Sequence, residues 1–163
     1  MNIRRARTSE APQLSALVMA SKRHWGYSAA QLRAWQPALT ITVGRLSDNV
    51  AFVAEIDGRI GGFYVLVATA PALALEHFWV HPDCMNRGLG RALLEHARAT
   101  AAGAGASHIR IDADPNAEAF YLACGARRDG VVAAPIPGHP GRVRPQLILP
   151  VAAPATKPGA DAG

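Results

Sequence analysis

The stretch from residue 84 to residue 96, CMNRGLGRALLEH, places two glycines and two arginines at the start of a predicted helix. The first N–H groups of a helix have no partner within it, and the helix dipole adds partial positive charge there. Because Gly88 and Gly90 lack a Cβ atom, an anion can approach these amides closely. Arg87 and Arg91 can add charged hydrogen bonds. The stretch therefore predicts an anion site, with phosphate as the expected anion.

The glycine spacing alone leaves two interpretations open. The chain contains neither the GxxxxGK[ST] pattern of nucleoside triphosphate sites nor the GxGxxG pattern of dinucleotide sites. A lone GLG also suits a tight turn between a strand and a helix that binds nothing. The surrounding elements must decide between the two.

Sequence periodicity places this motif between a strand and the longest predicted helix. In chain order, the predicted elements are a strand at 2–6, helices at 9–25 and 28–35, strands at 49–56, 59–69 and 73–82, a helix at 88–105, a strand at 108–114, a helix at 116–126 and two strands within 127–150. Ser9 and Ser28 are the predicted N-caps, and Asp57-Gly58 predicts a hairpin turn. The order is mixed rather than alternating, which argues against a doubly wound parallel sheet.

Length and composition limit the classes of function. With 163 residues, the chain is predicted to form one domain over 1–150 and a disordered tail at 151–163. Its net charge of +5 arises within residues 1–48, without the basic stripe and interleaved aromatic residues of a nucleic-acid-binding surface. No stretch approaches the roughly 18 apolar residues of a membrane span. We therefore expect a cytoplasmic protein with no nucleic-acid or membrane partner.

The cysteines and histidines predict neither a disulfide framework nor a metal site. There are two cysteines, Cys84 and Cys124, and the six histidines form no HxH pair; His77 and His81 have the HxxxH spacing, but they lie in a predicted strand rather than on one face of a helix. Both cysteines are interpreted as structural.

Taken together, these features resemble the GNAT superfamily of acyl-CoA-dependent N-acetyltransferases. Residues 80–82, VHP, end a strand, and residues 85–90, MNRGLG, stand where the family has its Q/R-x-x-G-x-G/A motif for acetyl-CoA. Residues 114–126, DPNAEAFYLACGA, are similar to the family's N-x-x-A-x-x-x-Y segment. The resemblance covers residues 50–135 well. It implies a mixed α/β (α+β) fold, in which a mostly antiparallel sheet of six or seven strands splays in the middle between about four helices.

Two positions depart from the family pattern. Met85 stands where the family usually has Gln or Arg, which removes one polar contact near the pyrophosphate, and the backbone amides are expected to compensate. Asp114 stands where many members have Asn, and Asn116 is expected to supply the nearby amide group instead.

The resemblance implies acetyl-CoA as the cofactor and names its binding residues. The pantetheine arm is expected along the backbone of Phe78, Trp79 and Val80, where it can pair like an added strand. The pyrophosphate is expected at the amides of Asn86, Arg87, Gly88, Leu89, Gly90 and Arg91. A strand amide near the acetyl carbonyl would stabilise the oxyanion that forms during transfer.

Acetyl transfer to an amine requires a proton donor for the sulfur and a base for the ammonium. Tyr121 occupies the family's tyrosine position and is the expected donor, although a core role beside Phe120 is the alternative. Glu76, in LEHFWV, resembles the glutamate of the LEDFFV strand in spermidine/spermine N-acetyltransferases and is the expected base, acting through water. Partial burial would raise its pKa toward the working pH, but pairing with an arginine is also open.

Two other residues are weaker candidates for the base. His77 follows Glu76 in the same strand, so its side chain is expected on the opposite face of the sheet. Asp112 is weaker still.

Aromatic residues in 21–35, SKRHWGYSAAQLRAW, mark the expected acceptor side. Trp25, Tyr27 and Trp35 suit an organic cation or a flat apolar group, although packing in the core explains them equally well. In the loop PIPGHPGRVRP, Arg142 or Arg144 is a candidate for an acidic group of the substrate.

We therefore expect an acetyl-CoA-dependent N-acetyltransferase that acts on a primary amine, predicted to be that of a small molecule, by direct attack in a ternary complex. A protein or peptide N-acetyltransferase and a non-catalytic acyl-CoA-binding regulatory module are the alternatives. The identity of the amine stays open. A homodimer is expected only by analogy with the family.

Overall fold

The fold is described from a computed structural model over residues 1–151. The predicted disordered tail at 151–163 lies outside the described residues, apart from Val151. The strands are β1 (Asn2–Arg5), β2 (Val50–Ile56), β3 (Arg59–Thr69), β4 (Ala72–Val80), β5 (His108–Asp112), β6 (Arg127–Ala133) and β7 (Val143–Pro150). The helices are α1 (Ala11–His24), α2 (Ala29–Leu39), α3 (Val43–Ser47), α4 (Leu89–Gly103) and α5 (Glu118–Ala123).

All seven strands form one sheet in the order β1-β2-β3-β4-β5-β7-β6. Every neighbouring pair is antiparallel except β4 and β5, which run parallel because α4 connects them. The predicted mixed fold with a mostly antiparallel sheet is therefore confirmed. The described residues add one short helix, α3, that the sequence did not predict, since five residues are too few to show a period.

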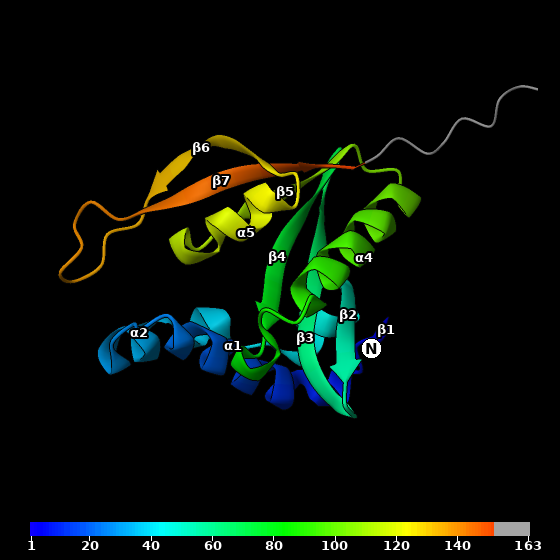
Figure 1. Cartoon of the computed structure of the whole chain (residues 1–163), viewed down its shortest axis with the longest axis horizontal. Coiled ribbons are helices and arrows are strands. Elements are labelled where there is room, and N and C mark those ends of the chain that lie inside the picture. The colour runs from blue at the N-terminus through cyan, green and yellow to red at the C-terminus, as the bar shows by residue number, and fades with distance from the viewer. Residues whose placement is uncertain (152–163) are drawn as a thin grey trace, which may run out of the picture.

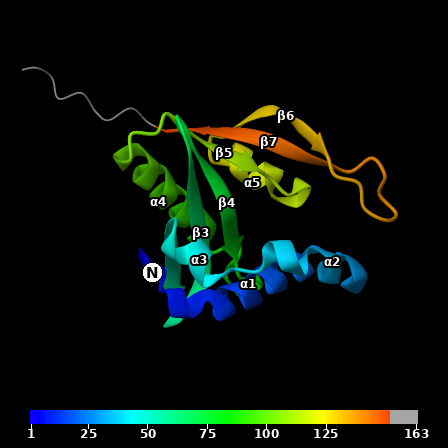
Figure 2. The same ribbon diagram turned by 180° about the vertical axis from the view of Figure 1, so that it is seen from behind.

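Helices cover both faces of the sheet and enclose two separate cores. Figure 1 shows α4 and α5 on one face, and Figure 2 shows α1 and α3 on the other. The core under α4 is built on Leu93, Leu94, Ala97, Tyr64 and Ile109. The core under α1 is built on Leu14, Val18, Val53, Phe63 and Val65. β3 contributes to both cores, as expected for a central strand that is apolar on both faces.

Of the two predicted N-caps, one is confirmed and the other is wrong. Ser28 caps α2 as predicted, because its hydroxyl accepts a hydrogen bond from the Gln31 amide at 3.1 Å. The predicted cap Ser9 is wrong, since α1 begins one residue later, after Glu10. The Glu10 carboxylate bonds the Arg7 amide and the Arg4 guanidinium, which turns the chain into the helix.

The hairpin between β2 and β3 turns at Asp57 and Gly58, as predicted. Both residues have positive φ, 52° and 73°, as the tight hairpin turn requires. Within residues 1–151, no helix has both the length and the hydrophobicity to cross a membrane.

Candidate active site

The sheet opens where β4 leaves β5. Their pairing is limited to Leu73–Leu75 of β4, opposite Ile109–Ile111 of β5. From His77 to Val80, β4 remains paired with β3 alone, while β5 continues along β7. The β4 edge that carries Phe78, Trp79 and Val80 is therefore unpaired, and Figure 1 shows the two strands diverging there. An extended chain of amides can add to such an edge as another strand would.

A β-bulge in β4 lies at the same place. Val65 pairs with His77 and Leu66 pairs with Leu75, so Glu76 is the extra residue of the pair. The prediction that His77 faces away from Glu76 is wrong, because the bulge turns both residues to the α1 side. His77 stacks on Phe63 of that core, and Glu76 pairs with Arg45 of α3 at 2.7 Å.

The start of α4 offers free backbone amides. Gly88 is the N-cap at φ 80°, a conformation that suits glycine, and it provides no side-chain oxygen to the amides of the first turn. A Cβ added to Gly88 would meet nothing within 4 Å, so the space in front of this turn is open. An acyl-CoA pyrophosphate fits these features, because the amides of the first turn and the helix dipole are both directed at that space.

Two glycines of β3, which the sequence analysis overlooked, bring α4 close to the sheet. A Cβ on Gly61 or Gly62 would lie 2.9 or 2.8 Å from the Leu89 side chain, so neither position can hold a larger residue without a shift. Leu89 itself is buried, and only its backbone is available to a ligand. Adjacent glycines within a strand were the signal of this close approach.

The two arginines of the motif are exposed at this end of α4. Arg87 lies 3.2 Å from Asp57 of the β2–β3 turn, and Arg91 is on the solvent side of the helix. Asn86 is exposed and has a φ of 57°. All three residues therefore border the open space, whereas Asn116 hydrogen-bonds Tyr27 on the acceptor side.

Tyr121 lies between the α4 start and the free edge of β4. It is 5% exposed, and its ring packs edge-on against Phe78 and Phe120 at centroid distances of 5.8 and 5.2 Å. Phe120 in turn lies 3.4 Å from the position of a Cβ on Gly90. Burial, helped by the charge of Asp114, raises the pKa of the Tyr121 hydroxyl, so this hydroxyl stays protonated at neutral pH.

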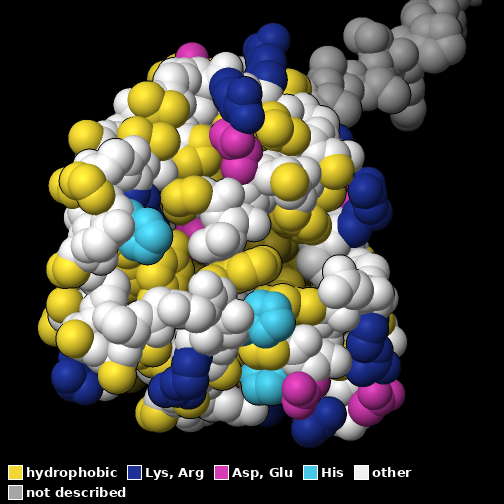
Figure 3. Space-filling model, turned by 60° about the vertical axis from the view of Figure 1, so that its left-hand side comes forward, with side chains coloured by type: hydrophobic (Ala, Val, Ile, Leu, Met, Phe, Trp, Pro, Cys, Tyr) yellow, Lys and Arg dark blue, Asp and Glu magenta, His cyan; other side chains and the backbone are white. Residues whose placement is uncertain are grey.

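A cavity of about 790 Å³ lies on the acceptor side. The α1–α2 turn, the segment after β5 and the β6–β7 loop form its walls, with Trp25 and Tyr27 among the lining residues. Trp35 stands behind Tyr27 and contacts it edge-on at 4.7 Å. Figure 3 shows hydrophobic side chains gathered in a hollow on this side of the molecule.

A buried ion pair joins α1 to the segment after β5. The ammonium of Lys22, on α1, lies 2.5 Å from the carboxylate of Asp114, and both side chains are about nine-tenths buried. The Asp114 oxygens also accept hydrogen bonds from the Tyr27 hydroxyl and from the amide and side chain of Asn116. The guanidinium of Arg142 lies 3.8 Å from the same carboxylate. These groups tie α1, the segment after β5 and the β6–β7 loop together.

The pKa values of the pair follow from its surroundings. Burial lowers the pKa of Lys22, and the charge of Asp114 opposes this shift. Burial alone would raise the pKa of Asp114, but Lys22 and the hydrogen bonds from Asn116 and Tyr27 outweigh it and hold the pKa below its usual value. Asp114 is therefore ionised at neutral pH, with Lys22 as its nearest cation.

Sequence reasoning missed Lys22 altogether and noted Asp114 only as a departure from the family pattern, without its partner. Leu14, Val18 and Lys22 follow one another at four-residue spacing and share the buried face of α1, which was a signal for a buried lysine. Its partner could not be found in the same way, because Asp114 is 92 residues further along the chain.

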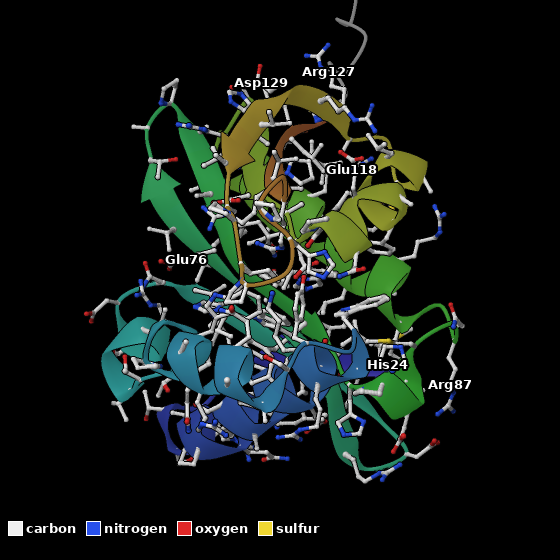
Figure 4. The ribbon with its side chains drawn as sticks, turned by 90° about the vertical axis from the view of Figure 1, so that its left-hand side faces the viewer. His24, Glu76, Arg87, Glu118, Arg127 and Asp129 are labelled. Carbon is white, nitrogen blue, oxygen red and sulfur yellow. The ribbon has the colours of Figure 1, made fainter. Side chains whose placement is uncertain are left out.

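The predicted base and its alternatives lie apart from the buried pair. Glu76 is 36% exposed in its side chain and pairs with Arg45, so the expected partial burial is not observed. Figure 4 shows Glu76 and Arg87 at opposite edges of the molecule. Asp112 is exposed and bonds Arg144 at 2.9 Å. The two arginines of the PIPGHPGRVRP segment therefore lie in different places. Arg142 lines the cavity, whereas Arg144 lies in β7 and does not.

Comparisons with known proteins agree with this geometry. Residues 47–125 match the family model described as an acetyltransferase (GNAT) domain. Comparison with curated proteins found no match. Among solved structures, a GCN5-related N-acetyltransferase from Rhodopseudomonas palustris superposes with a TM-score of 0.77 at 24% identity, covering 91% of this chain and 94% of that one.

Two further structures show the same fold at lower identity. The PaiA N-acetyltransferase from Thermoplasma acidophilum, solved in complex with coenzyme A, has a TM-score of 0.73 at 17% identity, covering 91% of this chain and 98% of that one. The ribosomal protein S18 alanine N-acetyltransferase from Escherichia coli has a TM-score of 0.70 at 19% identity, covering 99% and 98%. The family match over residues 47–125 and the splayed sheet lead to one conclusion: the chain contains an acetyltransferase (GNAT) domain.

Proposed function

We propose that the protein transfers the acetyl group of acetyl-CoA to the primary amine of a small molecule, by direct attack in a ternary complex. One observation carries the proposal: the β4 edge at Phe78, Trp79 and Val80 is unpaired and lies beside the glycine-capped start of α4. A thioester held along that edge would have the Tyr121 ring beside it, because that ring packs against Phe78.

The binding of coenzyme A is assigned to backbone groups. The backbone of Phe78, Trp79 and Val80 would pair with the amides of the pantetheine arm. The amides of residues 86–91 would bind the pyrophosphate, and Arg87 and Arg91 would add charge. Among the groups so assigned, only these two arginines contribute charged side chains, so the loss of a polar side chain at Met85 is compatible with binding.

Tyr121 is the proposed proton donor. When the amine nitrogen forms its bond to the carbonyl carbon, the carbon–sulfur bond breaks and the electron pair leaves on sulfur. A hydroxyl whose pKa is raised by burial is protonated at neutral pH and can donate to that sulfur. Its ring is held against Phe78, at the edge where the thioester would lie.

Glu76 is the proposed base, acting through water. The bulge turns its carboxylate to the α1 side, and its partial exposure gives water access to it. Arg45 holds it in place. We expect Glu76→Gln to remove the acid limb of the pH–rate profile, and a limb that persists would assign the base to another group.

The size of the cavity supports a small acceptor. A volume of about 790 Å³ falls within the range of roughly 300–1,000 Å³ that is typical of small-molecule sites. The β6–β7 loop forms one of its walls.

The test is CoA release from acetyl-CoA with a panel of small amines and of short peptides. Saturable release with a small amine supports the proposal. If acetyl-CoA raises the melting temperature but no amine is acetylated, the protein is a binding module. A clear preference for peptides would overturn the assignment of a small-molecule acceptor.

A further inference from the structure

We propose that the acceptor amine also carries a carboxylate, which Arg142 binds inside the cavity. This inference rests on the proposed function and narrows it to amino-acid-like acceptors. It depends on the balance of charge around the cavity, on the saturation of Asp114 and on what already fills the aromatic cluster.

The lining of the cavity is positive. Its fourteen lining residues include one arginine, Arg142, and one histidine, His139, but no aspartate or glutamate. Directly behind the wall, Lys22 and Arg142 face the single carboxylate of Asp114, which leaves one net positive charge in this group of three. An acceptor with several ammonium groups would meet no free acid here, whereas a carboxylate would meet a cation.

Asp114 has no capacity left for a substrate ammonium. One oxygen accepts the Asn116 amide and side chain, both at 2.9 Å, and the Tyr27 hydroxyl at 3.1 Å. The other accepts Lys22 at 2.5 Å and shares the single Tyr27 hydroxyl proton with the first, at 2.9 Å, so four donors surround the carboxylate. A carboxylate has about four lone-pair sites, so a further cation could bind only by displacing one of these partners.

The protein's own cations occupy the aromatic cluster. The Lys22 ammonium lies over the rings of Trp35, Tyr27 and Trp79, at 4.6, 5.1 and 5.7 Å from their centroids. The Arg142 guanidinium lies over Trp35 and Tyr27 at 5.4 and 5.5 Å. An organic cation from solution would have to compete with both. Of the uses expected for these rings, packing against a flat apolar group and packing within the protein are the ones that remain.

Arg142 is held in place and still has hydrogen-bond donors free. It donates to the Ala134 carbonyl at 3.0 Å and to the Tyr27 hydroxyl at 3.2 Å, which fixes the guanidinium in the cavity wall. A guanidinium has five N–H donors, and these two bonds use only part of them. A fixed, partly bonded guanidinium binds a carboxylate with little loss of side-chain freedom.

The experiment measures kcat/KM for amino acids and for the amines that remain when their carboxylate is removed, such as phenylalanine and phenethylamine, with spermidine as a polycation. Rates are compared per unprotonated amine, because the carboxylate changes the pKa of its neighbour. We expect the carboxylated member of at least one pair to be favoured tenfold or more, and spermidine to be poor. A preference for the decarboxylated members or for spermidine would overturn the inference while leaving the acetyltransferase function intact.

Variants of the two loop arginines provide the matched comparison. Arg142→Gln should raise KM for the favoured amino acid about tenfold more than it raises KM for the decarboxylated partner, whereas Arg142→Lys should restore part of that difference. Arg144→Gln is the control, because Arg144 pairs with Asp112 outside the cavity. Equal losses for both members of a pair in Arg142→Gln would contradict carboxylate binding. Failure of every amine with the wild-type protein would instead overturn the proposed function itself.

Discussion

The two ends of the proposed cleft are built in different ways. At the end assigned to coenzyme A, the available groups are backbone amides, presented by a glycine-capped helix and by an unpaired strand edge. At the acceptor end, they are charged and aromatic side chains brought together from α1, from the segment after β5 and from the β6–β7 loop. One end uses groups that every residue has, and the other depends on particular residues.

This difference explains which features of the site tolerate change. Most substitutions leave the backbone amides in place. Met85 therefore would not change the type of group that this end offers to coenzyme A. At the acceptor end, a neutral replacement of Lys22, Asp114 or Arg142 changes the charge balance, because these three side chains make up the buried charged group. Variation at the acceptor end is therefore the expected source of substrate specificity on this fold.

The largest expected effect concerns Tyr121, where the two ends meet. Tyr121→Phe should lower kcat about a thousandfold, within the range of general acid catalysis, and leave the affinity for coenzyme A unchanged. Tyr64→Phe is the control, because Tyr64 is equally buried but bonds His96 and Thr100 under α4. If both variants lose kcat equally, Tyr121 is a core residue and not the donor.

The next largest expected effect concerns the buried ion pair at the acceptor end. Lys22→Met leaves the Asp114 carboxylate buried with only Arg142 nearby, and breaking a buried pair in this way typically costs about 3–5 kcal/mol of unfolding free energy. Arg128→Gln breaks the exposed pair with Glu118 and should cost less than about 1 kcal/mol. Urea unfolding compares the two, and equal losses would mean that the pair at Asp114 is not coupled to folding.

A third effect depends on pH and concerns the α1 face of β4. Burial, and to a lesser degree the charge of Arg45, lowers the pKa of His77 from 6.5 to about 4. Between these values the unfolded chain binds a proton that the folded protein does not, so stability falls as the pH drops. One such residue accounts for about 3 kcal/mol in total.

In His77→Phe this loss between pH 6.5 and 4 should largely disappear from urea unfolding curves. Part of the loss should remain, because burial also lowers the pKa of His96 on α4. His24→Gln, at an exposed position, should leave the whole loss in place. An unchanged acid limb in His77→Phe would show that His77 is already protonated in the folded protein.

The smallest expected effect concerns the end assigned to coenzyme A. Gly88→Ala forces an alanine to φ 80°, which costs about 1 kcal/mol or more and should weaken coenzyme A binding up to tenfold in calorimetry. Gly103→Ala is the matched control in the last turn of α4, where a Cβ meets nothing within 4 Å. It should stabilise the protein by about 0.5–1 kcal/mol and leave binding unaltered. Equal binding in both variants would argue against the glycine cap.

Much of the fold could be predicted because its signals are local. The Asp57-Gly58 turn, the Ser28 cap and the apolar run in β3 each act within a few residues, and each was predicted correctly. The face of His77 was predicted wrongly because strict alternation was assumed. The bulge at Glu76 depends on how β4 pairs with β3, which no local pattern in β4 reveals.

The sequence by itself determined where an anion could meet bare amides, because a glycine cap and the helix that follows it are contiguous in the chain. It also determined the order of the elements, since each period is read within one segment. Only the tertiary structure decided which charges neutralise one another. Lys22, Asp114 and Arg142 come from distant parts of the chain, and the energy of a buried charge depends on the groups that folding places beside it.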